Sequence, residues 1–168
     1  PDLPKRLPLS PPVVYRYING TEATFTGAEL LLRQEVGRRF SWSTTGSYVR
    51  GDDDLFDEPV LGLAPLTGVI ELETHGPDRR YGVALVTTMV DRQDRVATSR
   101  FEMPTPGYTT YDLRGSYAVN EALTLRAGVE NLSDKAYSHH LNSPDPFSRQ
   151  RIPEPGRSWY LSFRWGAR

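Results

Sequence analysis

The sequence predicts an all-β fold: an antiparallel, up-and-down transmembrane β-barrel segment of about seven strands. Apolar and polar residues alternate in one segment after another, and the period of an amphipathic helix is not seen. Aromatic residues make up 11% of the 168 residues although hydrophobic residues make up only 38%. That combination is typical of a wall that is polar on one side. Short and long connections alternate strictly along the chain.

Seven segments have the alternation of a strand that meets different environments on its two faces. They are 24–36, 40–48, 66–73, 81–89, 111–119, 123–130 and 157–165. At roughly 9 to 14 residues, such strands cross a bilayer when tilted. The last one is the clearest, because every second residue is large and apolar: Trp159, Leu161, Phe163 and Trp165. We expect the two tryptophans at the membrane interfaces, and the leucine and phenylalanine in the apolar band between them.

The same alternation assigns a set of charged residues to the opposite face, which would line a water-filled lumen. They are Glu29, Glu71, Glu73, Asp112, Arg114, Arg126, Glu130 and Arg164. The expected role of these residues is a lattice of ion pairs that holds the wall together.

The connections between the segments sort by length. Tight turns are expected at 36–39, 75–78 and 119–122, where Gly, Pro, Asn and Asp occur. Long loops are expected at 51–64, 94–106 and 134–156. Successive antiparallel strands place all tight turns at one end and all long loops at the other, as in bacterial outer-membrane barrels. The predicted location is therefore the bacterial outer membrane.

The sequence also divides the chain into segments and argues against several classes of function. Residues 1–12 are Pro-rich and are expected to form an extended arm or loop, residues 13–165 the barrel part, and residues 166–168 a short tail. The chain starts at Pro1 and shows no signal peptide, which suggests a mature or truncated piece. The sequence has no glycine-rich phosphate-binding loop and no recognisable motif around a catalytic nucleophile, so neither an enzyme nor a cofactor is predicted. A net charge of −1 and dispersed basic residues argue against a nucleic-acid partner.

Two C-terminal stretches, GVENLSDKAYSHHL (128–141) and IPEPGRSWYLSFRW (152–165), resemble the end of TonB-dependent outer-membrane receptors. The matching residues are Asn131, Leu132, Asp134, Glu154, Pro155, Gly156 and Arg157, whereas Ser133 stands where the family usually has Phe. Asn19, Gly27 and Glu29 fill the positions of a second family element. The stretches SYVRG, RQDRV and PTPGY resemble the copper-receptor branch of the family.

The resemblance implies a larger, 22-stranded barrel filled by a plug, of which this chain is the last third. It implies uptake of a scarce ligand such as a ferric siderophore, copper or cobalamin. The implied partners are outer-membrane lipid, the missing N-terminal barrel and plug, the energy-coupling TonB complex acting through the plug, and a small-molecule or metal-chelate ligand. Family members end on the aromatic residue that the assembly machinery is thought to read, whereas residues 166–168 follow Trp165 here.

Ligand-proximal residues are expected in the long loops, where aromatic and charged side chains occur: Phe56, His139, His140, Phe147 and Arg149. No metal site is assigned. Adjacent histidines in an extended chain point in opposite directions and cannot easily bind the same ion. Met89 belongs to the apolar residues of its strand, where packing is the expected role. Met103 lies in a long loop and remains a candidate soft metal ligand. The acidic stretch 51–58 lacks the spacing of a calcium loop and is expected to be a solvated loop.

Two other hypotheses remain open from the sequence. A small self-contained barrel with a structural or adhesin role requires the first and last strands to pair, helped by a further strand within 1–18. A soluble β-sandwich binding module would be favoured by solubility without detergent.

Overall fold

The computed structural model describes residues 22–145, 147–148 and 150–166. The Pro-rich segment 1–12, the further strand considered within 1–18, and Arg149 lie outside the described residues. Of the expected tail 166–168, only Gly166 is described, and its N–H donates to the Ala122 carbonyl at 3.0 Å.

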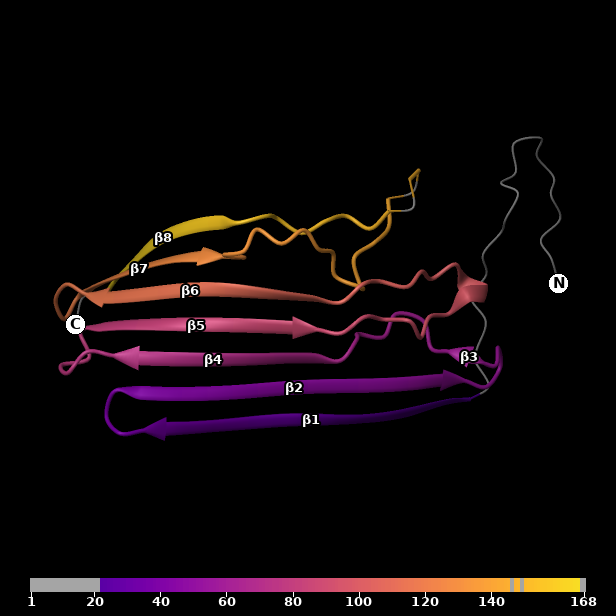
Figure 1. Ribbon diagram of the computed structural model, residues 1–168, viewed down its shortest axis with the longest axis horizontal. Coiled ribbons are helices and arrows are strands. Elements are labelled where there is room, and N and C mark those ends of the chain that lie inside the picture. The colour runs from indigo at the N-terminus through magenta and orange to yellow at the C-terminus, as the bar shows by residue number, and fades with distance from the viewer. Residues whose placement is uncertain (1–21, 146, 149, 167–168) are drawn as a thin grey trace.

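The described residues form one antiparallel sheet (Figure 1). Its strands are β1 (Ala23–Val36), β2 (Phe40–Asp53), β3 (Glu58–Pro59), β4 (Thr67–His75), β5 (Tyr81–Val90), β6 (Tyr108–Ala118), β7 (Leu123–Glu130) and β8 (Ser158–Trp165). Every long strand pairs with the next long strand in sequence, and β3 pairs only with β2. The all-β, up-and-down fold is therefore confirmed. The sequence did not predict β3, because two residues are too few to show an alternation.

Strand β2 is longer than its sequence pattern indicated. It pairs with β1 from Val36 opposite Phe40 to Ala23 opposite Asp53, and so extends into the predicted loop 51–64. Its final acidic residues pair with both β1 and β3, and their side chains form ion pairs with arginines of a neighbouring loop: Asp52 with Arg95, and Asp53 with Arg100.

The register gives the sheet two chemically different faces, because residues paired across strands lie on the same face. One cross-strand row consists of Trp42, Leu72, Leu85, Leu113, Val129 and Trp159. We call the face with this row the apolar face, and Leu161, Phe163 and Trp165 share it. The neighbouring row, on the opposite face, contains Ser43, Glu71, Val86 and Asp112. We call that one the polar face.

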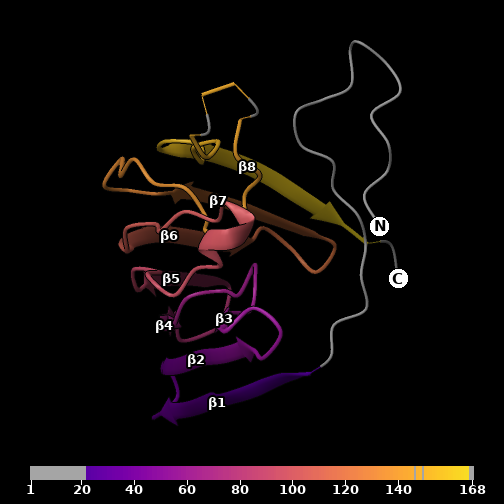
Figure 2. The same ribbon diagram turned by 90° about the vertical axis from the view of Figure 1, so that its right-hand side faces the viewer.

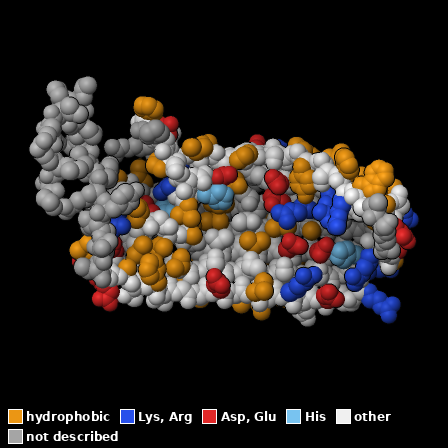
Figure 3. Space-filling model, turned by 180° about the vertical axis from the view of Figure 1, so that it is seen from behind, with side chains coloured by type: hydrophobic (Ala, Val, Ile, Leu, Met, Phe, Trp, Pro, Cys, Tyr) orange, Lys and Arg blue, Asp and Glu red, His pale blue; other side chains and the backbone are white. Residues whose placement is uncertain are grey.

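All eight charged residues assigned to a lumen by the sequence lie on the polar face: Glu29, Glu71, Glu73, Asp112, Arg114, Arg126, Glu130 and Arg164. Among these eight residues, Asp112 forms an ion pair with Arg114, and Glu73 forms one with His75 on its own strand. Charged side chains gather toward the end with the tight turns (Figure 3).

The sheet is a single open layer. Figure 2 shows β1 and β8 at its two ends, so the first and last described strands do not pair as a self-contained barrel requires. No second sheet covers either face in the described ranges. Side chains of β8 on the apolar face are 74% to 78% exposed: Trp159, Leu161, Phe163 and Trp165. None of the helices among the described residues has the length and apolar character to cross a bilayer.

Candidate functional site

The three long connections, 54–66, 91–107 and 131–157, lie at the same end of the sheet (Figure 1). They contain most of the buried polar residues of the described chain, including Gln93, Thr105, Asn131 and His140. Buried polar groups need hydrogen-bond partners. The loops therefore form one packed, internally bonded structure.

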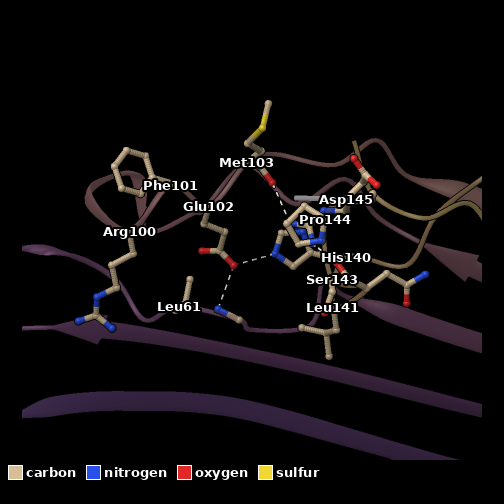
Figure 4. A pocket seen from close by; sticks show the side chains of 13 residues that line it. Leu61, Arg100, Phe101, Glu102, Met103, His140, Leu141, Ser143, Pro144 and Asp145 are labelled. Carbon is tan, nitrogen blue, oxygen red and sulfur yellow. Dashed lines mark hydrogen bonds and ion pairs between the residues drawn. The ribbon is translucent and has the colours of Figure 1, made fainter. Parts of the chain in front are cut away.

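The centre of this structure is the carboxylate of Glu102. Its Oε1 accepts the Gly62 N–H at 2.9 Å and lies 3.0 Å from His140 Nε2, and its Oε2 accepts the Ala97 N–H at 2.7 Å. His140 Nδ1 lies 2.9 Å from Thr105 Oγ1. We call these five residues the Glu102 cluster. Figure 4 shows Glu102 between His140 and the backbone beside Leu61. One carboxylate thus connects all three long loops.

The Glu102 cluster is shielded from water. The side chains of His140 and Glu102 are 1% and 5% exposed. Burial disfavours the charged carboxylate, but the N–H groups of Ala97 and Gly62 and the His140 ring outweigh it, so the pKa of Glu102 lies below its ordinary value. The cluster therefore contains a carboxylate that stays ionised above acidic pH.

The acidic stretch 51–58 is also bonded to the loop 91–107. Besides the two ion pairs at the end of β2, Glu58 Oε2 accepts the Ser99 N–H at 3.1 Å. The Arg100 guanidinium lies 4.4 Å from the centre of the Phe56 ring, a cation–π contact. Arg95 and Arg100 thus pair with Asp52 and Asp53, whereas residues 54–57 are exposed, as expected of a solvated loop. In the part of the chain that the structure describes, no group of three or more His, Cys, Asp or Glu residues is placed to hold a metal ion.

A second cluster is aromatic and joins the start of β6 to the loop 131–157. The ring centres of Tyr108 and Tyr137 lie 4.2 Å apart, and the hydroxyl of Tyr108 lies 2.6 Å from His139 Nδ1. Burial and the nearby Glu154 carboxylate raise the pKa of Tyr137.

The four described residues among those expected near a ligand, Phe56, His139, His140 and Phe147, do not form one site. His139 belongs to the aromatic cluster with its side chain 51% exposed, whereas His140 is buried in the Glu102 cluster. Phe56 stacks on Arg100, and Phe147 is 95% exposed at the tip of its loop. Sequence reasoning missed Glu102, Tyr108 and Tyr137. The contacts that join them to another loop span 29 to 40 positions in sequence, and no local pattern signals such contacts.

The family-like residues connect the end of β7 to the start of β8. Asn131 is buried with a positive φ of 50°, and its side chain accepts the Lys135 N–H at 2.8 Å and donates to the Lys135 carbonyl at 2.9 Å. Leu132 N–H donates to the Tyr111 carbonyl at 2.7 Å. Asp134 Oδ1 accepts the Arg157 N–H at 2.8 Å. A Cβ on Gly156 would lie 2.7 Å from the same oxygen. Before Pro155, the Glu154 N–H donates to the Tyr137 carbonyl at 2.9 Å.

Replacing Asp134 with Ala is expected to loosen the start of β8. The Arg157 N–H would lose its charged acceptor, at a cost of about 1 kcal/mol, and its hydrogen exchange in the intact protein would accelerate. The matched control is Asp134→Asn, which keeps an oxygen at the same position and should retain most of the protection. Equal exchange in Asp134→Ala and the unmodified protein would contradict this role.

An open pocket of about 470 Å³ lies beside the Glu102 cluster, between the loops (Figure 4). Its lining includes Leu61, Phe101, Met103, Leu141 and Arg151. Pockets of this size accommodate small molecules.

Comparisons with known proteins agree with this architecture. A family model described as TonB dependent receptor-like, beta-barrel, matches residues 2–132. The ferric enterobactin receptor PirA of Pseudomonas aeruginosa is 27% identical over 158 residues, which cover 89% of this chain and 21% of that protein. Hemoglobin-haptoglobin-binding protein A of Haemophilus influenzae is 25% identical over 191 residues, covering 94% of this chain and 18% of that protein.

A solved structure described as copper transporter OprC superposes with a TM-score of 0.80 at 23% identity, covering 85% of this chain and 23% of that one. This likeness shows a shared fold. The chain spans about a fifth of the length of the curated relatives it matches. Because the family model covers well over half of its residues, the chain belongs to the TonB-dependent receptor-like β-barrel family.

Proposed function

We propose that this chain is the C-terminal part of the barrel wall of a TonB-dependent transporter in the bacterial outer membrane. One observation carries the proposal: a single sheet has an exposed apolar face, a polar face with all the predicted lumenal charges, and its long loops at one end. A wall between lipid and water requires this arrangement. In this proposal the apolar face contacts lipid and the polar face lines a lumen.

The proposed activity is uptake of a scarce ligand, with this chain supplying three external loops of the ligand's vestibule. The candidate ligands are a ferric siderophore, copper and cobalamin. The PirA likeness supports an iron chelate, and the fold of OprC keeps copper in consideration. The proposed partners are the rest of the barrel, a plug within it, and the TonB complex that drives plug rearrangement. Of the ligand-proximal residues, His139 and Phe147 remain candidates because their side chains are exposed.

Deleting the gene that encodes this chain tests the proposal. Uptake of radioactive ferric siderophore, copper and cobalamin would be measured in the deletion strain and in its parent. We expect one of the three to be lost and to be restored by the intact gene. Retention of all three would contradict the proposed function.

Expression of this chain by itself in the deletion strain provides a control. We expect no energy-coupled uptake, because the large plugged barrels of this class need the plug and the remaining strands. Coupled uptake by the chain alone would show that this division of roles is wrong.

A further inference from the structure

Arginines are concentrated in two of the tight turns, the one after β1 and the one after β4. We call them the turn arginines: Arg38, Arg39, Arg79 and Arg80. All of them are exposed residues. The acidic residues of the tight turns 37–39, 76–80 and 119–122 are Asp78 and Glu121, so these turns have a surplus of positive charge. Figure 3 shows that Lys and Arg side chains gather toward this end of the sheet.

The tight turns are bonded to one another side by side. The His75 N–H at the end of β4 donates to the Arg39 carbonyl at 2.8 Å, which joins the first turn to the second. Arg80 joins the second turn to the third. Its Nη2 donates to the Val119 carbonyl at 2.9 Å, and its own carbonyl accepts the Ala118 N–H at 2.6 Å. The turn arginines therefore belong to one continuous surface.

The turn arginines differ from the arginines at the other end of the sheet in having no acidic partner. Near the long loops, ion pairs with aspartates are formed by Arg50, Arg92, Arg95 and Arg100. In the described ranges no turn arginine forms an ion pair, and the side chain of Arg80 donates to neutral carbonyls. Asp78 Oδ1 accepts the backbone N–H of Arg80 at 3.1 Å, within its own turn. The positive charge of the turn arginines is thus left for an external anion.

Exposed aromatic side chains lie beside these turns on the apolar face. They are Phe40, Tyr81, Tyr117, Phe163 and Trp165. Belts of aromatic residues are typical of the level at which lipid headgroups begin. The Arg80 guanidinium lies 5.9 Å from the centre of the Tyr117 ring, a cation–π contact. This contact places a turn arginine directly at the aromatic belt.

The phosphate of a lipid is the anion that fits this position. A guanidinium binds two oxygens of one phosphate at once, and clusters of about four or more basic residues beside a membrane segment attract anionic lipids. A soluble acidic partner would compensate the arginines, but it would leave the adjacent aromatic belt exposed to water. A lipid accounts for both features, because its headgroup and its acyl chains occupy neighbouring levels.

We propose that the turn arginines bind the phosphate of an anionic phospholipid in the leaflet at the tight-turn end, with its acyl chains packed along the aromatic residues of the apolar face. The inference rests on the proposed membrane function and specifies one lipid partner of the wall. An anionic headgroup is preferred to a zwitterionic one, because the cation of a zwitterion competes with arginine for the phosphate.

The test compares two short-chain lipids with the same acyl chains, phosphatidylglycerol and phosphatidylcholine, by native mass spectrometry of the intact protein in a non-ionic detergent. We expect phosphatidylglycerol to bind more tightly. The triple variant Arg38→Gln/Arg39→Gln/Arg79→Gln should weaken its binding at least about fivefold and have a much smaller effect on phosphatidylcholine. Retained phosphatidylcholine binding also shows that the variant is folded. Arg80 is left unchanged because its side chain is bonded to the third turn.

The matched control removes the same amount of charge at the other end of the sheet, in Arg50→Gln/Arg92→Gln/Arg95→Gln. These loop-end arginines are already ion-paired, so the affinity for phosphatidylglycerol should not change. Equal binding of the two lipids by the unmodified protein, an unchanged affinity in the turn variant, or an equal loss in both triple variants would overturn the proposal.

The deletion-strain uptake assay separates this failure from failure of the proposed function. If uptake is lost on deletion but the turn variant binds phosphatidylglycerol as the unmodified protein does, the function stands and the headgroup site falls. If deletion affects no uptake while the turn variant still loses phosphatidylglycerol binding, the headgroup site stands without that function.

Discussion

Replacing Leu161 with Arg is expected to destabilise the protein in lipid by about 2–4 kcal/mol, the cost of a cation on the lipid face near the bilayer centre. Leu161 lies on the apolar face of β8, between Trp159 and Trp165, and is 78% exposed. If that face contacted water, the substitution would change stability by no more than about 0.5 kcal/mol. Urea unfolding of the intact protein inserted in lipid vesicles measures the difference.

The matched control is Ser162→Arg, one residue further along β8 on the polar face. Ser162 pairs with Arg126, so like charges face each other at a cost of up to about 1 kcal/mol. This cost makes Ser162→Arg somewhat destabilising by itself, so a larger loss of stability in Leu161→Arg would be stronger evidence for lipid contact. Equal destabilisation by both arginines would contradict the assignment of the apolar face to lipid.

The fold could be predicted from the sequence because consecutive residues of a strand point to opposite faces, so two different environments produce an alternation of apolar and polar residues. The alternation of Trp159, Leu161, Phe163 and Trp165 needs no knowledge of partners, and a period of two assigns each residue to a face. For the same reason the residues predicted to line a lumen, including Glu71 and Asp112, could be placed together on one face before the register was known.

The arrangement of the loops did not follow from the sequence. The contacts of Glu102 with Gly62 and His140 span 40 and 38 positions, and loop residues have no period that relates such distant partners. Aromatic and charged residue types suggested ligand contact for His139 and His140 alike. The structure separates them, because the His139 ring contacts two tyrosine rings edge-on, whereas the His140 ring is buried against a carboxylate.

Replacing Glu102 with Ala is expected to separate the three long loops. The substitution leaves the Gly62 and Ala97 N–H groups and the His140 ring without their common acceptor, in a site where Glu102 is 5% exposed. Unsatisfied buried groups cost about 1–3 kcal/mol each, so a local loss of several kcal/mol follows. Hydrogen exchange of the Gly62 and Ala97 amides in the intact protein should accelerate at least tenfold. The matched control is Asp94→Ala, which removes an exposed ion pair with Arg92 in the same loop and should have little effect.

The same contacts should weaken in acid. The pKa of Glu102 is lower in the folded protein than its ordinary value of 4.5 because of the donors around it. Its contribution to stability is therefore complete above the ordinary pKa and is lost as the pH falls through the lower, folded value. Protection of the Gly62 and Ala97 amides, corrected for intrinsic exchange, should decrease below about pH 4.5 in the unmodified protein. In Glu102→Gln this decrease should be absent, because the amide does not titrate. A decrease of the same size in both proteins would show that another group, and not the Glu102 carboxylate, holds the loops together.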